Sequence, residues 1–256
     1  MEKTTGCVWC GRTPTTIEDI WPKWVGRYLG HRPVRQVLSG GGRRYGSFRG
    51  LSNVAKAKVV CEACNGGWMH DLEEASVYIK RMFDENVNLH LPAGDDEARH
   101  LMAQWCFKTA LMVQYVHGVS VVPAAVYHDF HPTRELPDGC MIFLARHETK
   151  LLPNGAHAVV LDVSLAAAPT LKGEIYGITF FIKNVVVQVI GHRAPFGVHV
   201  YLPQTFRPYV YRLWPPGRPV EWPPILSLSD EGVIQFGEAL AGMKSAIFNL
   251  PPGALT

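Results

Sequence analysis

The chain of 256 residues has no uninterrupted apolar run of the roughly 18 residues that a membrane-spanning helix requires. Its longest apolar stretch, residues 177–191, is interrupted by Lys183, Asn184 and Gln188. The first residues are charged or polar and lack the apolar core of a secretion signal. We therefore expect a cytoplasmic protein with no membrane partner.

Charged residues are also scarce, since Asp, Glu, Lys and Arg make up 18% of the chain and hydrophobic residues make up 47%. Disordered chains show the opposite balance, so this composition predicts a packed core. The formal net charge is only +3, but residues 1–70 carry +7 and the rest of the chain carries −4. This asymmetry favours contact between the first quarter and a polyanion such as nucleic acid, with chance clustering on a solvated surface as the alternative.

Cysteine is infrequent as well, yet four of the six cysteines form two Cys-x-x-Cys pairs, Cys7 with Cys10 and Cys61 with Cys64. In a cytosolic protein, such pairs are more typical of a metal site than of disulfides. Four thiolates complete a tetrahedron around Zn²⁺ and leave no open coordination position. We predict a structural Zn²⁺ that joins two distant segments; redox-active pairs or unrelated buried thiols are the alternatives.

Hydrophobic periodicity predicts an α+β fold, in which helical segments precede a mostly antiparallel β body. The helices are expected to follow Asn65-Gly66-Gly67, to run from Asp95 or Asp96 to His117, and to cover residues 230–247. Strands are expected at residues 55–61, 141–146, 157–165, 174–182 and 184–192. The glycine-rich basic segment 39–50 is expected to be a flexible loop, and the proline-rich segment 203–224 to be irregular. We divide the chain into an N-terminal zinc-binding module, residues 1–90, and a C-terminal α+β domain of unassigned role, residues 91–256.

The order of the N-terminal motifs resembles a known family. A Cys-x-x-Cys pair is followed by Glu18-Asp19-Ile20-Trp21-Pro22-Lys23-Trp24-Val25, and then by Val59-Val60-Cys61-Glu62-Ala63-Cys64-Asn65-Gly66-Gly67-Trp68-Met69 with Leu72-Glu73. This series resembles the zinc-stapled HNH, or His-Me finger, endonucleases, including the recombination endonuclease VII type. The resemblance covers about residues 5–85 and implies a ββα finger held by zinc, followed by the helices and the β body.

By this resemblance, Glu18 is the acid that binds a catalytic Mg²⁺ or Mn²⁺, and Asn65 is the second ligand of that ion. The family places its general-base histidine at position 19. The implied activity is metal-dependent cleavage of nucleic acid, with DNA as the partner. The candidate phosphate-binding residues are basic side chains on the way from the acidic pair to the second cysteine pair: Lys23, Arg43, Arg44 and Arg49.

Position 19 departs from the family pattern, because this chain has Asp there. A carboxylate is ordinarily a poorer base than imidazole at neutral pH. Three interpretations stay open: Asp19 acts as the base with a raised pKa, a histidine such as His31 or His70 replaces it, or the module has lost catalysis and only binds nucleic acid or a protein partner. Because His70 lies five residues after Asn65, about 140° around an α-helix, it is expected to be poorly aimed at the same ion.

Overall fold

The computed structural model describes residues 6–13, 16–29, 33–40, 43–51, 55–84, 87–92, 94–117, 120, 122–148, 154–165, 168–196, 198, 200 and 202–242. In the hairpin strands β2 and β3, the description covers the backbone alone. The strands are β1 (Thr16–Asp19), β2 (Pro33–Gly40), β3 (Arg43–Leu51), β4 (Lys56–Val60), β5 (Leu89–Leu91), β6 (Met141–Arg146), β7 (Asn154–Leu165), β8 (Ala168–Ile182), β9 (Val185–Arg193), β10 (Val210–Trp214) and β11 (Val220–Trp222). The helices are η1 (Lys23–Val25), α1 (Gly26–Leu29), α2 (Glu62–Cys64), η2 (Asn65–Met69), α3 (His70–Ala75), α4 (Val77–Met82), α5 (Asp96–Val113), η3 (Gln114–His117), α6 (Ala124–Thr133), η4 (Gln204–Phe206) and α7 (Asp230–Gly242).

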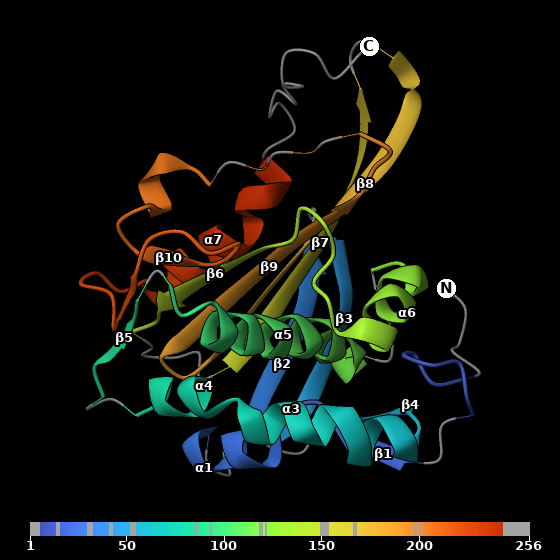
Figure 1. The fold of residues 1–256 in the computed structure, drawn as a ribbon, viewed down its shortest axis with the longest axis horizontal. Coiled ribbons are helices and arrows are strands. Elements are labelled where there is room, and N and C mark those ends of the chain that lie inside the picture. The colour runs from blue at the N-terminus through green and yellow to red at the C-terminus, as the bar shows by residue number, and fades with distance from the viewer. Residues whose placement is uncertain are drawn as a thin grey trace.

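A five-stranded antiparallel sheet in the order β10-β6-β9-β8-β7 forms the centre of the molecule (Figure 1). This arrangement confirms the predicted α+β class and the antiparallel body. The expected reversal between β8 and β9 occurs at Lys183, which adopts a positive φ of 51°. Alternate residues of β8 face opposite sides of the sheet, so Phe180 contributes to one hydrophobic cluster and Phe181 to the other.

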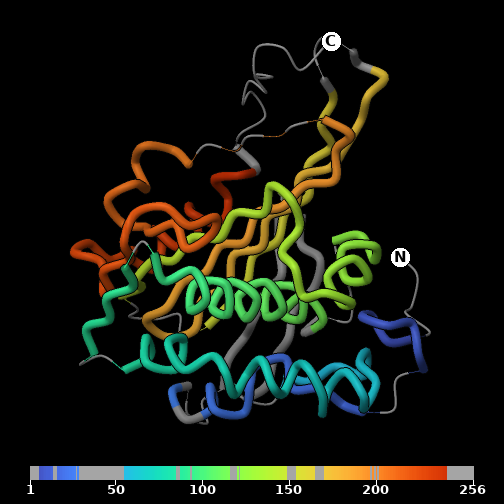
Figure 2. The backbone as a smooth tube through the Cα atoms, in the orientation of Figure 1, coloured from blue at the N-terminus to red at the C-terminus, as the bar shows by residue number. Residues whose placement is uncertain are grey.

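Helix α5 packs on one face of this sheet and α7 on the other. Helix α5 is buried around most of its circumference, as its apolar sequence predicts, and it crosses the centre of the molecule in Figure 2. It begins where predicted, because the Asp95 side chain accepts a hydrogen bond from the Ala98 amide at 3.3 Å. Among the helices that the structure describes, none combines the length and hydropathy that crossing a bilayer would need.

The predicted flexible loop at residues 39–50 is wrong, because β2 and β3 pair as a long antiparallel hairpin over this segment. Backbone groups form the ladder between the two strands, so glycine can take part in it. Gly46 of β3 lies opposite Leu38 of β2, and Gly50 lies opposite Val34. The hairpin is inserted between β1 and β4, and β2 contacts the edge strand β7. The basic segment therefore packs against the main sheet through the contact between β2 and β7.

The expectation of an irregular segment at residues 203–224 is also wrong, since β10 and β11 lie within it. β10 pairs with β6 at the edge of the main sheet, and β11 pairs with β5. The prolines flank these strands, where no ladder hydrogen bond is lost. Helix α6 was not predicted; its buried residues Val126, Tyr127 and Phe130 keep helical spacing, but the helix is only ten residues long and contains Pro132.

One hydrophobic cluster includes residues from both sides of the predicted boundary at residue 90. Two polar contacts join the same parts, since the Met82 carbonyl accepts hydrogen bonds from Asn184 Nδ2 at 3.2 Å and from Trp222 Nε1 at 3.3 Å. The division into residues 1–90 and 91–256 stays a prediction. The contacts mean that the N-terminal segments are packed on the body that follows.

Candidate functional site

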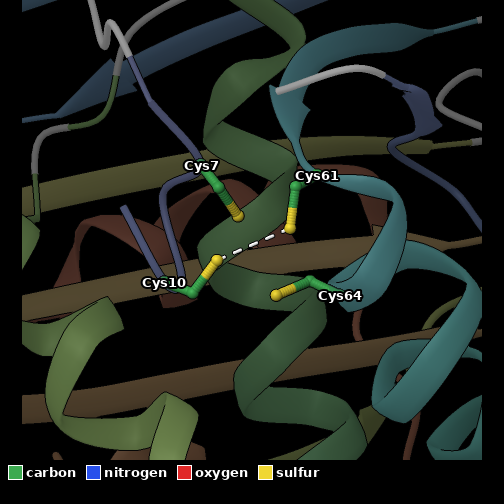
Figure 3. A group of neighbouring side chains, drawn as sticks. All are labelled: Cys7, Cys10, Cys61 and Cys64. Carbon is green, nitrogen blue, oxygen red and sulfur yellow. Dashed lines mark hydrogen bonds between the residues drawn. The ribbon is translucent and has the colours of Figure 1, made fainter. Parts of the chain in front are cut away.

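The four paired cysteines converge on one point in space. The sulfurs of Cys7, Cys10, Cys61 and Cys64 all lie within 4.8 Å of one another, and Figure 3 shows them directed at a common centre. Cys10 Sγ lies 3.5 Å from Cys61 Sγ. A zinc–sulfur bond of about 2.3 Å places the corners of a regular tetrahedron about 3.8 Å apart. The donor set and its spacing therefore fit Zn²⁺, which these four thiolates would hold.

Local backbone structure positions the two pairs. The first pair lies on a turn in which the Gly11 amide donates to the Cys7 carbonyl at 2.8 Å, and Gly11 takes the positive φ of 75° that closes it. The Val8 amide donates to the Val59 carbonyl at 2.9 Å, which ties this turn to the end of β4. The second pair begins the helical segment after β4. The cysteine cluster thus joins the turn at residues 7–11 to the strand–helix junction.

The four thiols have unequal acidities. Burial acts to raise the pKa of Cys61, but the backbone hydrogen bond at Cys64 and the neighbouring thiols outweigh it and lower that pKa to about 7. Burial raises the pKa of Cys64. The Cys61 thiolate is consequently available to a metal ion at neutral pH, which is the form that binds zinc.

A cleft of about 510 Å³ lies beside this junction, and all three predicted catalytic residues line it. Glu18 and Asp19 come from β1, which pairs antiparallel with β4, and Asn65 follows Cys64 directly. The strand alternates, so Glu18 is buried while Ile17 is exposed. The predicted phosphate-binding residue Lys23 lines the same cleft.

Asn65 is held by its amide nitrogen. Asn65 Nδ2 donates to Thr16 Oγ1 at 3.3 Å, and Thr16 Oγ1 donates to the Val60 carbonyl at 2.9 Å. This chain of contacts fixes the side chain against β1 and β4. Asn65 Oδ1 has no hydrogen bond within the described part of the chain, and an amide oxygen is a suitable ligand for a hard cation.

His70 lines the same cleft as Asn65. The segment Asn65–Met69 is a π-helical turn with non-helical torsions at Gly67, where φ is −100° and ψ is −119°. The helical path is kinked at this point, so regular helical spacing does not fix the direction of the His70 side chain, which is exposed at the rim of the cleft.

The wall of the cleft contains an ion pair that sequence analysis missed. Lys108 of α5 is 2% exposed, and its Nζ lies 2.7 Å from Oε1 of Glu73, which lines the cleft. A lysine in the middle of a helix that is buried around most of its circumference was the available signal, because such a charge needs a partner. Exposed Glu74 also lines the cleft. The cleft is therefore lined by four acidic residues and by two basic ones, Lys23 and His70.

The two neighbouring acids of β1, Glu18 and Asp19, differ in burial and in ion pairing. Burial raises the pKa of Glu18 to about 7; Lys108 acts to lower it, and Glu73 and Asp19 act to raise it further. Asp19 is more exposed and forms an ion pair with Lys56, with 3.2 Å between Oδ1 and Nζ. The titrating carboxyl near neutral pH is therefore that of Glu18, because it is the desolvated one.

Other predicted residues lie outside this description. Arg43, Arg44 and Arg49 belong to β3, of which only the backbone is described, and His31 lies outside the described residues. The comparisons add no relative: no protein-family model matches the chain, and neither a curated protein nor a solved structure is significantly similar to it.

Proposed function

We propose that this protein is a metal-dependent nuclease of the HNH type that acts on DNA, with β1, β4 and the helical segment after Cys61 serving as its ββα finger. The observation that carries the proposal is that Glu18, Asp19 and Asn65 line one cleft next to four clustered cysteines. The cysteine cluster explains the geometry, because it fixes the start of the helical segment beside the paired strands. The sequence resemblance supplies the reaction class.

Glu18 and Asn65 would hold a Mg²⁺ or Mn²⁺ ion through a carboxylate and an amide oxygen. When bound, such an ion neutralises the scissile phosphate and stabilises the leaving oxygen. The cleft also offers acidic side chains to a cation. Asp19 and Glu73 are already paired with lysines, so Glu18 is the carboxyl whose charge the ion would balance.

His70 is the side chain to which we assign the general-base role. Asp19 occupies the family's base position, but its carboxylate is already paired with Lys56. Imidazole is the commonest general base in enzymes, and His70 lines the cleft. His70 would accept the proton of the attacking water, while Lys23 at the cleft rim contacts phosphate.

The test is cleavage of plasmid, single-stranded and branched DNA with added Mg²⁺ or Mn²⁺. We expect Glu18→Ala, Asn65→Ala and His70→Ala each to reduce the rate by about 10²-fold or more, as loss of a general base does. Glu97→Ala, an exposed acid in the first turn of α5, is the matched control and should leave the rate unchanged. Cleavage that survives the first three substitutions would refute the assignment.

A second function is favoured by one observation, the ion pair of Asp19 with Lys56. If the module has lost catalysis, it would bind nucleic acid or a protein partner without turnover. Binding through Arg43, Arg44 and Arg49 would then weaken with salt and with neutralisation of these arginines. Asp19→His separates the two functions: a sharp gain in cleavage identifies a decayed nuclease, whereas a loss of cleavage identifies Asp19 as the working residue.

A further inference from the structure

A second cleft lies at the edge of the main sheet, away from the acidic one. It has a volume of about 440 Å³, and strands β6 and β10 form its floor. In Figure 1 these strands lie on the left, whereas β1 and β4 lie at the lower right. The volume falls within the range of small-molecule sites, roughly 300–1,000 Å³.

Three arginines line this cleft, and no acidic residue is among its described lining. The side chains of Arg207, Arg212 and Arg218 are exposed, and none forms an ion pair with a described residue. Three guanidinium groups without a carboxylate partner repel one another, and each offers a planar fork that fits phosphate oxygens. The cleft is therefore complementary to a ligand with several negative charges.

The arginines are placed by features of the fold. Arg212 lies on β10 opposite Phe143 of β6. Its Nη2 approaches Gly217 so closely that a Cβ atom there would lie 2.7 Å from it. Glycine at this position thus leaves room for the guanidinium to lie against the turn that leads to Arg218.

A buried cation lies behind the same turn. Arg99 is 0% exposed, and its Nη2 donates to the carbonyls of Arg218 at 3.1 Å and Leu91 at 2.9 Å. Its described partners are all carbonyl oxygens, so no carboxylate in the described part of the chain neutralises it. Arg99 both anchors the Arg218 loop and adds positive potential behind it.

The remaining lining is apolar. Met141, Phe143 and Leu202 form a hydrophobic surface beside the arginines, and Tyr211 adds an aromatic ring. A surface of this kind binds the organic part of a ligand, while the charged groups fix its phosphate end. A terminal phosphate carries about −1.5 to −2 charges at neutral pH, so two linked phosphates match three guanidinium groups.

We propose that this cleft binds a nucleoside diphosphate or a close analogue, with its phosphates on Arg207, Arg212 and Arg218 and its base against Phe143 and Met141. The site is independent of the proposed nuclease centre, because it shares no lining residue with the acidic cleft. Its occupancy needs no divalent cation, since the arginines supply the positive charge.

The experiment is calorimetric titration of the full chain with ADP, without added divalent cations. We expect saturable binding that weakens about tenfold or more in Arg207→Ala, Arg212→Ala and Arg218→Ala, as expected for loss of a charge-assisted hydrogen bond. Gly217→Ala should weaken binding while retaining every charge, because the new Cβ displaces the Arg212 guanidinium. Arg81→Ala, an exposed arginine of α4 outside the cleft, is the control and should bind as the unmodified chain does.

Inorganic pyrophosphate and a short single-stranded oligonucleotide complete the test. Pyrophosphate should bind more weakly than ADP, because it lacks the base that contacts the apolar surface. Equal affinity for the two would overturn the nucleotide assignment, and so would binding of the oligonucleotide alone. Affinity for ADP that is unchanged in the three arginine variants would overturn the site itself.

Discussion

Replacing Glu18 with glutamine should make the protein more stable at neutral and alkaline pH. Burial raises the pKa of this carboxyl from 4.5 to about 7, so the folded state binds its proton more tightly than the unfolded state does. Stability from this group is fully present below pH 4.5 and is lost as the pH rises to about 7. Each unit of pKa difference corresponds to about 1.4 kcal/mol, which gives about 3 kcal/mol for the whole shift.

The substitution removes this loss, because an amide carries no charge to desolvate. Between pH 5 and pH 8, the free energy of unfolding of the Glu18→Gln variant should rise by about 2.5 kcal/mol relative to that of the unmodified chain. Urea denaturation at a series of pH values measures both proteins. Comparing their difference cancels the contribution of the four cysteines, which titrate in both.

Glu74→Gln is the matched control, since its side chain lines the same cleft but is 66% exposed. Its stability relative to the unmodified chain should vary little over this pH range. Added Mg²⁺ should stabilise the unmodified chain and not the Glu18→Gln variant, because the ion binds the carboxylate. A stability difference for Glu18→Gln that is flat from pH 5 to pH 8 would show that the Glu18 carboxyl is not desolvated, and the reasoning would fail.

Three further predictions concern a buried ion pair, the cysteine cluster and a contact of α7. Lys108→Met should destabilise the fold by about 3–5 kcal/mol, because it leaves Glu73 unpaired. The second change Glu73→Leu should recover much of that lost stability. A double-mutant cycle measured by urea denaturation tests this, and no recovery in the double variant would contradict it. Cys61→Ser should lower the zinc content from about one ion per chain, whereas a zinc content equal to that of the unmodified chain would exclude the four-sulfur site. Asp230→Ala should cost about 1.5–3 kcal/mol by removing the carboxylate 2.8 Å from buried His147 Nε2, and an unchanged urea midpoint would argue against this contact.

Local sequence signals predicted much of the fold. The strands β6, β8 and β9, the reversal between the last two, and the buried helix α5 with its Asp95 cap follow from alternation, turn residues and helical periodicity. These signals are short-range, because each depends on residues within one element. The hairpin β2–β3 and the edge strand β10 were missed since their strand pairing comes from backbone groups, which glycine and neighbouring proline do not prevent.

For the candidate site, spacing alone identified the four cysteines, and resemblance identified Glu18, Asp19 and Asn65. Sequence reasoning named His70 only as a possible replacement for the base, because helical spacing says little about its direction where the chain is kinked at Gly67. It could not find the partner of Lys108 either, since Glu73 lies 35 residues away. Contacts between distant residues depend on how helices pack, and no local pattern encodes them.

The sequence by itself determined the antiparallel α+β class, the two cysteine pairs and the acidic dipeptide, because these depend on residue type and near-neighbour spacing. Only the tertiary structure decided that the four sulfurs meet, that Glu18 is desolvated beside the Lys108–Glu73 pair, and that three arginines gather around one cleft. The physical reason is that desolvation and electrostatic potential depend on which segments pack together. Both are set by long-range packing, whereas secondary structure is set largely by local geometry.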